Sequence, residues 1–286
     1  MQSWYSLSLI ALLLLGTQRF LYKVAAERGC SSSLTTTVFM ATVSLLSLAA
    51  WLIQGADPGP WAVLVVLALV NSTSFAGATI ANIEALKRLP AGVTFPLTRL
   101  SLVLVMLFSL TYFDERLQPL QLLGILLGLA AAFFLARDLH RQAVPAERNR
   151  VGLLFVLAGI VCGAVSSISC KFAALQTSKA GFMALTYLLA TLFSLAINRR
   201  WGRKQDAGPA RDAILIGLVM GLLNFFGFYA LLAALEGGPL GIIVLITGMH
   251  FIVAIMLSVI IYRERLTMPR TLAIALTLVA VFFMKQ

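Results

Sequence analysis

Four polar side chains lie far inside long apolar stretches of the chain: Arg99, His250, Asn71 and Asn224. Burying such groups in lipid costs free energy, so they mark places where a solute or a neighbouring helix is bound. A guanidinium can hold a carboxylate through two parallel hydrogen bonds. An imidazole changes its charge between about pH 5 and 8. The residue types therefore predict a site for a small solute, with His250 as the proton-coupling residue.

Smaller polar residues and aromatic rings accompany these four at helical spacing. Phe75 follows Asn71 by four residues, and Phe228 follows Asn224 by four. Apolar walls with a few polar anchors are typical of small-molecule sites. The residues predicted to bind substrate are Arg99, Thr98, Ser101, His250, Thr247, Asn71, Phe75, Asn224, Phe228 and Ser166.

Each deep polar residue also has a purely structural interpretation. Arg99 can bond to carbonyls of a neighbouring broken helix instead of lining a cavity. His250 can be a packing residue with satisfied hydrogen bonds. Asparagines inside membrane helices join helices more often than they bind ligands.

The chain lacks the motifs of catalysis. It has no P-loop, no G-x-S-x-G and no H-E-x-x-H, and its three cysteines lack metal-ligand spacing. We therefore expect no enzyme, no catalytic residues, no metal, no cofactor and no ATP-driven pump. No Asp or Glu falls in the middle of an expected span, whereas carriers of organic cations usually need a buried carboxylate. Carboxylate-bearing or neutral polar solutes fit better than lipophilic cations.

The elements that position these residues are membrane-spanning helices. Hydrophobic residues make up 60% of the 286 and charged residues only 12%. A soluble domain of this length needs more charged surface. Apolar runs long enough to cross a hydrocarbon layer of roughly 30 Å recur along the chain. Ten spans are predicted, at 3–22, 33–53, 61–83, 91–112, 119–136, 151–170, 181–197, 212–235, 240–261 and 268–284.

The chain is internally duplicated. Residues 85–117 and 234–266 align without a gap at an offset of 149, and both segments end in Glu-Arg-Leu. Each copy holds five expected helices, and because five is odd the second copy must be inverted in the membrane. The predicted fold is an all-α integral membrane protein, with ten transmembrane helices in two inverted five-helix repeats around a central cavity. The expected units are 1–138, a cytoplasmic linker at 139–150, and 151–286.

Positive charges indicate the orientation. Among the Lys and Arg residues assigned to loops and helix ends, 16 fall on the odd-numbered loops and four on the even-numbered side. Because cytoplasmic loops are enriched in Lys and Arg, the odd loops should be cytoplasmic and both termini outside. The net charge of +11 is spread over short loops, so contact with lipid headgroups explains it better than binding of nucleic acid.

These features resemble the EamA-like branch of the drug/metabolite transporter superfamily. The likeness covers essentially the whole chain and is clearest at 113–130 and, more weakly, at 262–280. It implies a basket of helices whose central cavity is lined mainly by helices 1, 3, 4, 6, 8 and 9, with helices 5 and 10 as scaffold. Members of this family typically export amino acids, other small metabolites or toxic compounds by alternating access.

The paired Glu-Arg-Leu motifs and the glycine pairs are expected to be structural. Glu115 and Glu264 should complement the positive ends of the fifth and tenth helices; the alternative is a gate ion pair with neighbouring arginines. Three glycine pairs should form close helix contacts. They are Gly124 and Gly128, Gly159 and Gly163, and Gly217 and Gly221.

The function predicted is a secondary transporter, an exporter of small polar metabolites such as amino acids, acting as a uniporter or coupled to protons. The alternatives are a flippase for a lipid-linked sugar, a multidrug or organic-cation exporter on the same fold, and a membrane enzyme or structural protein. The expected partners are a small-molecule solute and membrane lipid, with no nucleic acid and no obligatory protein partner, so that a monomer suffices. The expected location is the bacterial cytoplasmic (inner) membrane.

Overall fold

The structure, a computed structural model, describes residues 3–86, 88–89, 94, 97–98, 100–115, 118–137, 146–201, 209–263 and 268–284. Throughout these ranges the regular structure is helical, with no strand. Seven helical segments are long and apolar enough to cross a membrane, and three shorter apolar helices accompany them. Together they form the ten spans expected from the sequence.

Within the described residues, the first repeat contributes five helical elements. They are α1 (Ser3–Glu27), α2 (Ser32–Gln54), α3 (Trp61–Leu86), α5 (Leu100–Tyr112) and α6 (Pro119–Arg137). The start of α2 is capped by Ser31, whose hydroxyl accepts a hydrogen bond from the Leu34 amide at 3.3 Å. Its end is Gly55 in the left-handed region, φ 55°, where glycine carries no steric penalty.

The described part of the second repeat contributes six elements. They are α7 (Ala146–Gln176), α8 (Lys179–Trp201), α9 (Ala210–Gly237), α10 (Leu240–Gly248), α11 (His250–Tyr262) and α12 (Met268–Phe283). Most helices extend a few residues beyond the expected spans, and two differences are larger. Helix α7 begins at Ala146, within the expected linker, and the ninth span is divided at Met249 into α10 and α11.

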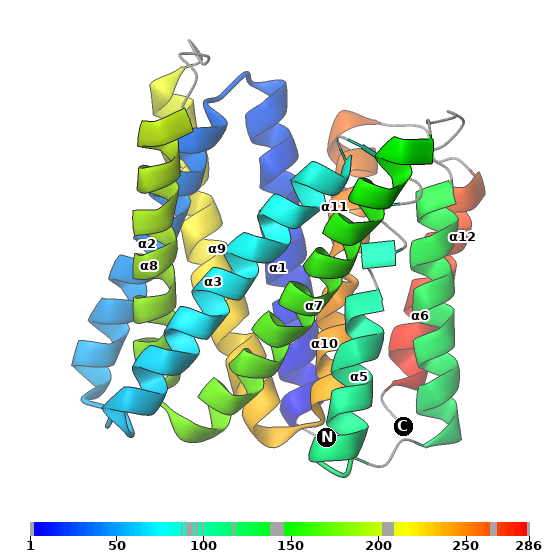
Figure 1. Ribbon diagram of the computed structural model, residues 1–286, viewed down its shortest axis with the longest axis horizontal. Helices are drawn as coiled ribbons and strands as arrows, with labels where there is room; N and C mark the ends of the chain where they lie inside the picture. Colours follow the sequence, from blue (N-terminus) through cyan, green and yellow to red (C-terminus); the bar gives the residue numbers. More distant parts are fainter. Residues whose placement is uncertain are drawn as a thin grey trace.

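Contacts between the two repeats occur in symmetric pairs. Helix α3 packs on α7 as α9 packs on α1, and α2 packs on α9 as α8 packs on α3. The α1–α11 contact likewise corresponds to the α7–α5 contact, while α2–α8 and α6–α12 join equivalent helices. Figure 1 shows α2 and α8 at one edge, α6 and α12 at the other, and both termini on one face. The chain is therefore two inverted five-helix repeats.

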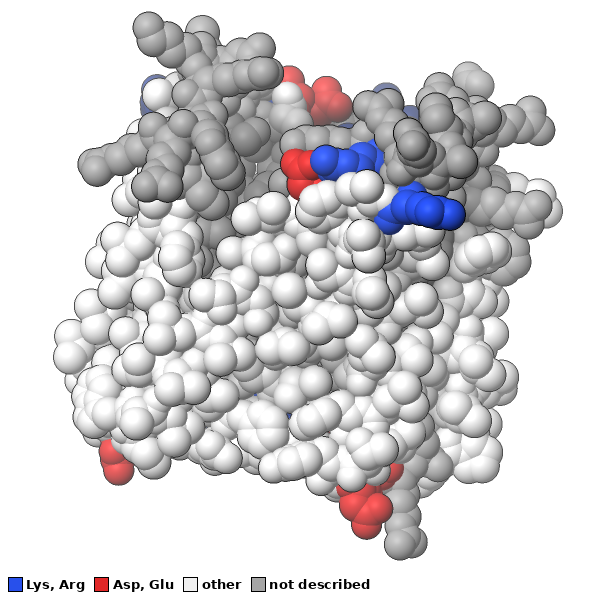
Figure 2. Space-filling view, viewed as in Figure 1, with Lys and Arg blue, Asp and Glu red and all other residues white. Residues whose placement is uncertain are grey.

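The surface has an apolar belt between two polar faces. In the view of Figure 2 the sides of the molecule are almost free of charged residues, and the charged side chains lie at the two ends. The exposed apolar side chains include Leu45, Leu154 and Leu218, from three different helices. This distribution is that of a protein surrounded by lipid along its sides.

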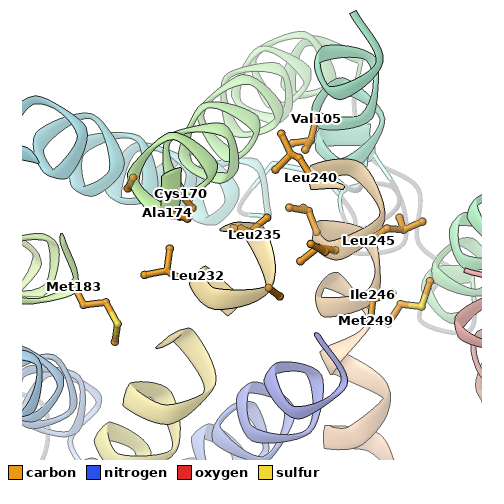
Figure 3. Packing of buried hydrophobic residues seen from close by; sticks show 14 of the residues in the cluster. Val105, Cys170, Ala174, Met183, Leu232, Leu235, Leu240, Leu245, Ile246 and Met249 are labelled. Carbon is orange, nitrogen blue, oxygen red and sulfur yellow. The ribbon is translucent and has the colours of Figure 1, made fainter. Parts of the chain in front are cut away.

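The centre of the molecule is built around α10. Every residue from Leu240 to Thr247 is buried, and Figure 3 shows Leu240, Leu245 and Ile246 surrounded by side chains of neighbouring helices. Lipid tails are as apolar as leucine, so this packing depends on close van der Waals contact. Glycines supply that contact at five of the six predicted positions, whereas a Cβ at Gly163 would make only ordinary contacts of 3.5 Å or more. A Cβ added at Gly124 would lie 2.8 Å from the Ala280 carbonyl oxygen, and one at Gly217 would lie 2.9 Å from that of Thr35.

Candidate functional site

Asn224 and Phe228 meet a third residue, Tyr187, at the contact between α8 and α9. The Tyr187 hydroxyl donates a hydrogen bond of 2.6 Å to Asn224 Oδ1. The Phe228 ring packs edge-on against the Tyr187 ring, with 5.8 Å between centroids. Asn224 is only 6% exposed. Its side-chain carbonyl oxygen is therefore buried, and the Tyr187 hydroxyl is the donor that satisfies it.

The aromatic contacts continue from Tyr187 to the first repeat. Its ring packs edge-on against Phe39 of α2 at 6.1 Å. Phe39 in turn packs against Tyr22 of α1 at 6.4 Å. Four helices, α1, α2, α8 and α9, thus contribute to one group with both hydroxyl and amide functions. We call Tyr22, Phe39, Tyr187, Asn224 and Phe228 the aromatic–amide group.

Arg19 stands at the edge of the aromatic–amide group. Its guanidinium carbon lies 5.9 Å from the centre of the Tyr22 ring, within the range of a cation–π contact. Arg19 itself is exposed, so its charge lies at the accessible border of this group. Arg19 lies eight residues before the end of α1, which is about 12 Å along the helix. Arg19 is not among the residues predicted from the sequence, although Gln18-Arg19 within an apolar run is the signal that marks it.

Asn71 and Ser166 are brought together at the α3–α7 contact. The Asn71 side-chain amide lies 2.9 Å from the Ser166 carbonyl oxygen and 2.9 Å from Ser169 Oγ. It also lies within hydrogen-bond distance of Ser166 Oγ and Cys170 Sγ. All of these groups belong to α7, and Asn71 is 4% exposed. The geometry is that of a joint between two helices.

Thr247 and His250 flank the interruption of the ninth span. Thr247 Oγ1 donates to the Ile243 carbonyl oxygen of its own helix at 2.8 Å. His250 Nδ1 lies 2.8 Å from the Thr247 carbonyl oxygen. Gly16 of α1 packs directly on this point, because a Cβ there would lie 2.8 Å from the His250 carbonyl oxygen and would overlap Val253. The interruption is therefore enclosed between α1 and its own two helical halves.

The remaining predicted residues are more dispersed. Arg99 lies outside the described residues. Thr98 and Ser101 are half-buried, and Ser101 faces Gly163 of α7, where an added Cβ would lie 3.5 Å from the Ser101 Cβ. Phe75 is 47% exposed, whereas Asn71 is buried, so the structure does not hold these two in one enclosed group. Among the described residues no cluster of His, Cys, Asp and Glu could hold a metal ion.

Two charged residues have partners other than those expected. The Glu115 carboxylate accepts a hydrogen bond of 2.7 Å from the Leu240 amide and contacts the Gly241 amide at 3.4 Å. Glu115 therefore caps α10 and not the fifth span. At the start of the fifth span, the Gln118 amide donates a hydrogen bond to the Gln121 side-chain oxygen instead. Lys171, expected as a helix-end charge, is buried and donates to backbone carbonyls. Glu264 lies outside the described residues.

Comparison with known proteins agrees with this architecture. A crystal structure is similar to the chain with a TM-score of 0.78 at 21% identity, over 98% of this chain and 96% of the other. The comparison with curated proteins finds no match. The sequence model of the EamA-like transporter family matches twice, at residues 2–137 and 150–285, once for each repeat. The chain belongs to the EamA-like transporter family of the drug/metabolite transporter superfamily, and is a multi-pass membrane transporter of small solutes.

Proposed function

We propose that this chain is a secondary transporter that exports small polar metabolites such as amino acids. The observation that carries the proposal is the position of Arg19 beside the aromatic–amide group. A guanidinium there can pair with a carboxylate, while Tyr187 and Asn224 offer hydrogen-bonding groups and Phe228 an apolar wall. This combination fits a zwitterion or another small carboxylate better than a lipophilic cation.

Alternating access around a midplane cavity is the proposed mechanism. It is supported by the symmetric pairing of contacts between the repeats, because two equivalent halves can exchange arrangements without losing their interface. It is also supported by the interruption at Met249, since broken helices at membrane depth usually border a transport site. The driving force is either the solute gradient or exchange of a proton at His250.

The proposed location is the bacterial cytoplasmic membrane, with the odd-numbered loops in the cytoplasm and both termini outside. The two repeats, 1–138 and 151–286 with a linker at 139–150, are proposed to form the complete unit as a monomer in contact with lipid. Fusions to the C-terminus test the orientation. Alkaline phosphatase should be active there and green fluorescent protein dark. The opposite result would reverse the topology.

Transport into proteoliposomes tests the function. Saturable flux of labelled amino acids is expected, with no flux of a lipophilic cation, and the response to an imposed pH gradient separates uniport from proton coupling. Cation flux alone would contradict the proposal. Flux confined to a lipid-linked sugar would identify a flippase.

Substitutions of the two arginines test the carboxylate pairing. Arg19→Gln should reduce amino-acid flux by about tenfold or more, because one charge-assisted pairing is worth about 1.5–3 kcal/mol. Flux of the corresponding amino-acid amide should change much less. Arg99→Ala tests the residue predicted from sequence in the same assay. Arg28→Gln is the matched control, because Arg28 lies at the same end of α1, in an exposed ion pair with Asp212 at 3.1 Å. An equal loss of amino-acid flux in Arg28→Gln would assign the effect of Arg19→Gln to net charge.

A further inference from the structure

The turn between α9 and α10 is held by two oppositely charged side chains. Lys171 Nζ donates to the Leu235 carbonyl oxygen at 2.6 Å and to that of Gly238 at 2.7 Å. Glu115 accepts from the Leu240 amide on the other side of the turn. Lys171 comes from α7 and Glu115 follows α5, so the turn is joined to two helices from different repeats.

The charges match the groups that they contact. The last carbonyls of a helix carry partial negative charge and the first amides partial positive charge, and both sets are unpaired within the helix. Lys171 satisfies carbonyls at the end of α9, and Glu115 satisfies amides at the start of α10. Each side chain therefore has polar backbone partners at its place beside the turn.

Further contacts close this end of the molecule. The Ser109 hydroxyl of α5 donates to the Glu115 carboxylate and accepts from the Gly241 amide at 3.1 Å. The Phe113 ring covers Lys171, with 5.4 Å from Nζ to its centre. Figure 3 shows Leu235 and Leu240, on either side of the turn, within the same core as Val105 and Cys170. Lys171 is 6% exposed as a result.

The same cation–ring pair recurs at the opposite end of the molecule. Lys23 of α1 lies over the Tyr262 ring of α11, with 4.9 Å from Nζ to the ring centre. Helix α1 corresponds to α7, and Tyr262 corresponds to Phe113 at the offset of 149. Because the repeats are inverted, one pair lies on the face of the even-numbered loops and the other on the face of the odd-numbered loops. We call them the even-side pair and the odd-side pair.

The two pairs differ in enclosure. Lys171 and its turn are buried, whereas Lys23 is half-buried and Tyr262 is 37% exposed. We propose that the pairs act as two locks of the transport cycle, and that both are formed in this structure, with the even-side lock the more enclosed of the two. The proposal rests on the alternating access proposed above. Releasing Lys171 would free the α9–α10 turn from α5 and α7 and so open the even side.

Distances between spin labels test the locks without any substrate. Cys30, Cys162 and Cys170 are first replaced by Ser. Cysteines are then introduced at Thr111 of α5 and Gly237 of α9 for the even side. A second label pair, at Ile80 of α3 and Ile261 of α11, reports on the odd side. All four positions are exposed, and Gly237 has open space around it.

In Lys171→Met, the fraction of molecules with a long distance between the even-side labels should rise from about a tenth or less to about half. Lys23→Met should instead lengthen the odd-side distance and leave the even side unchanged. Lys179→Met is the control, because it removes a neighbouring ion pair with Glu236 that lies outside the buried turn. It should change neither distance.

Unchanged distances in folded Lys171→Met protein would overturn the proposal, and so would an equal change in Lys179→Met. Folding is checked by circular dichroism and by elution volume. If Lys171→Met does not fold, Glu115→Gln decides, since it keeps the shape of the side chain and removes its charge. It should lengthen the even-side distance, and no change would overturn the lock. If the label distances change as expected but no amino-acid flux is found, the lock proposal is supported and only the proposed substrate is refuted.

Discussion

The Tyr187 hydroxyl and Asn224 Oδ1 are 2.6 Å apart, and this bond is the point at which α8 and α9 share a polar contact inside the apolar belt. The bond fixes the direction of the Asn224 amide, whose nitrogen must then face away from Tyr187. The packing of Phe39 and Phe228 on the same phenol ring limits its movement. An oriented amide of this kind is a suitable anchor for a polar solute.

Tyr187→Phe should weaken binding of the transported solute while preserving the fold. The ring contacts remain, but Asn224 loses its donor and is left with an unpaired, buried oxygen. That loss is worth about 1–2 kcal/mol, so KM for uptake should rise by about tenfold with a smaller change in maximal rate. Thr191→Val is the control, because the Thr191 hydroxyl donates only within its own helix, to the Tyr187 carbonyl. A KM that stays within about twofold of the parent in Tyr187→Phe would remove this bond from the substrate site.

Asn71→Ala should affect stability more than transport. The Asn71 amide contacts acceptors on three residues of α7, and interhelical hydrogen bonds in membranes are worth about 0.6 kcal/mol on average and up to about 1.7. We expect a loss of about 1–2 kcal/mol, seen as a lower melting temperature of the purified protein in detergent. Thr73→Val, on the exposed side of α3 and bonded only within its helix, should melt as the parent does. A raised KM with an unchanged melting temperature would instead place Asn71 in contact with the solute.

The fold could be predicted from the sequence because its signals are long. Ten apolar runs and a gap-free duplication leave little freedom in the number of spans or in the inversion of the repeats. The interruption at Met249 could not be predicted, since Gly248-Met249 lies in a continuous apolar run with no proline. At this point the ninth span packs closely on two other helices, since an added Cβ at Gly16 of α1 would meet the His250 carbonyl oxygen and one at Gly128 of α6 would meet Met249.

The candidate site was harder to predict because polar residues in a span have several ways of being satisfied. Asn71 and Asn224 have the same type and comparable depth, yet one joins two helices and the other meets a tyrosine within a ring cluster. Glu115 illustrates the same limit. Its carboxylate was expected at a helix start, which is correct, but the helix is α10, far away in sequence. Local spacing identifies the kind of partner that a charge needs, and only the packing of the helices decides which partner it has.

Gly16→Ala should impair both stability and transport. The added methyl group would meet Val253 and the His250 carbonyl oxygen, so α1 or α11 must shift at the interruption of the ninth span. Overpacking of this kind costs about 1–3 kcal/mol. Melting temperature and maximal uptake rate should both fall. Gly237→Ala is the matched control, because nothing lies within 4 Å of a Cβ there, and parent-like behaviour of Gly16→Ala would show that α1 can yield at this crossing without consequence.

His250→Gln tests proton coupling at the same interruption. The imidazole Nδ1 lies 2.8 Å from the Thr247 carbonyl oxygen, and a glutamine side chain keeps hydrogen-bonding capacity while removing the group that titrates near neutral pH. If His250 carries the proton, the dependence of uptake on external pH should flatten, and an imposed pH gradient should no longer drive accumulation above equilibrium. Exchange of labelled solute outside for unlabelled solute inside should continue, because exchange needs no net proton movement. A pH profile identical to that of the parent would exclude His250 as the proton carrier.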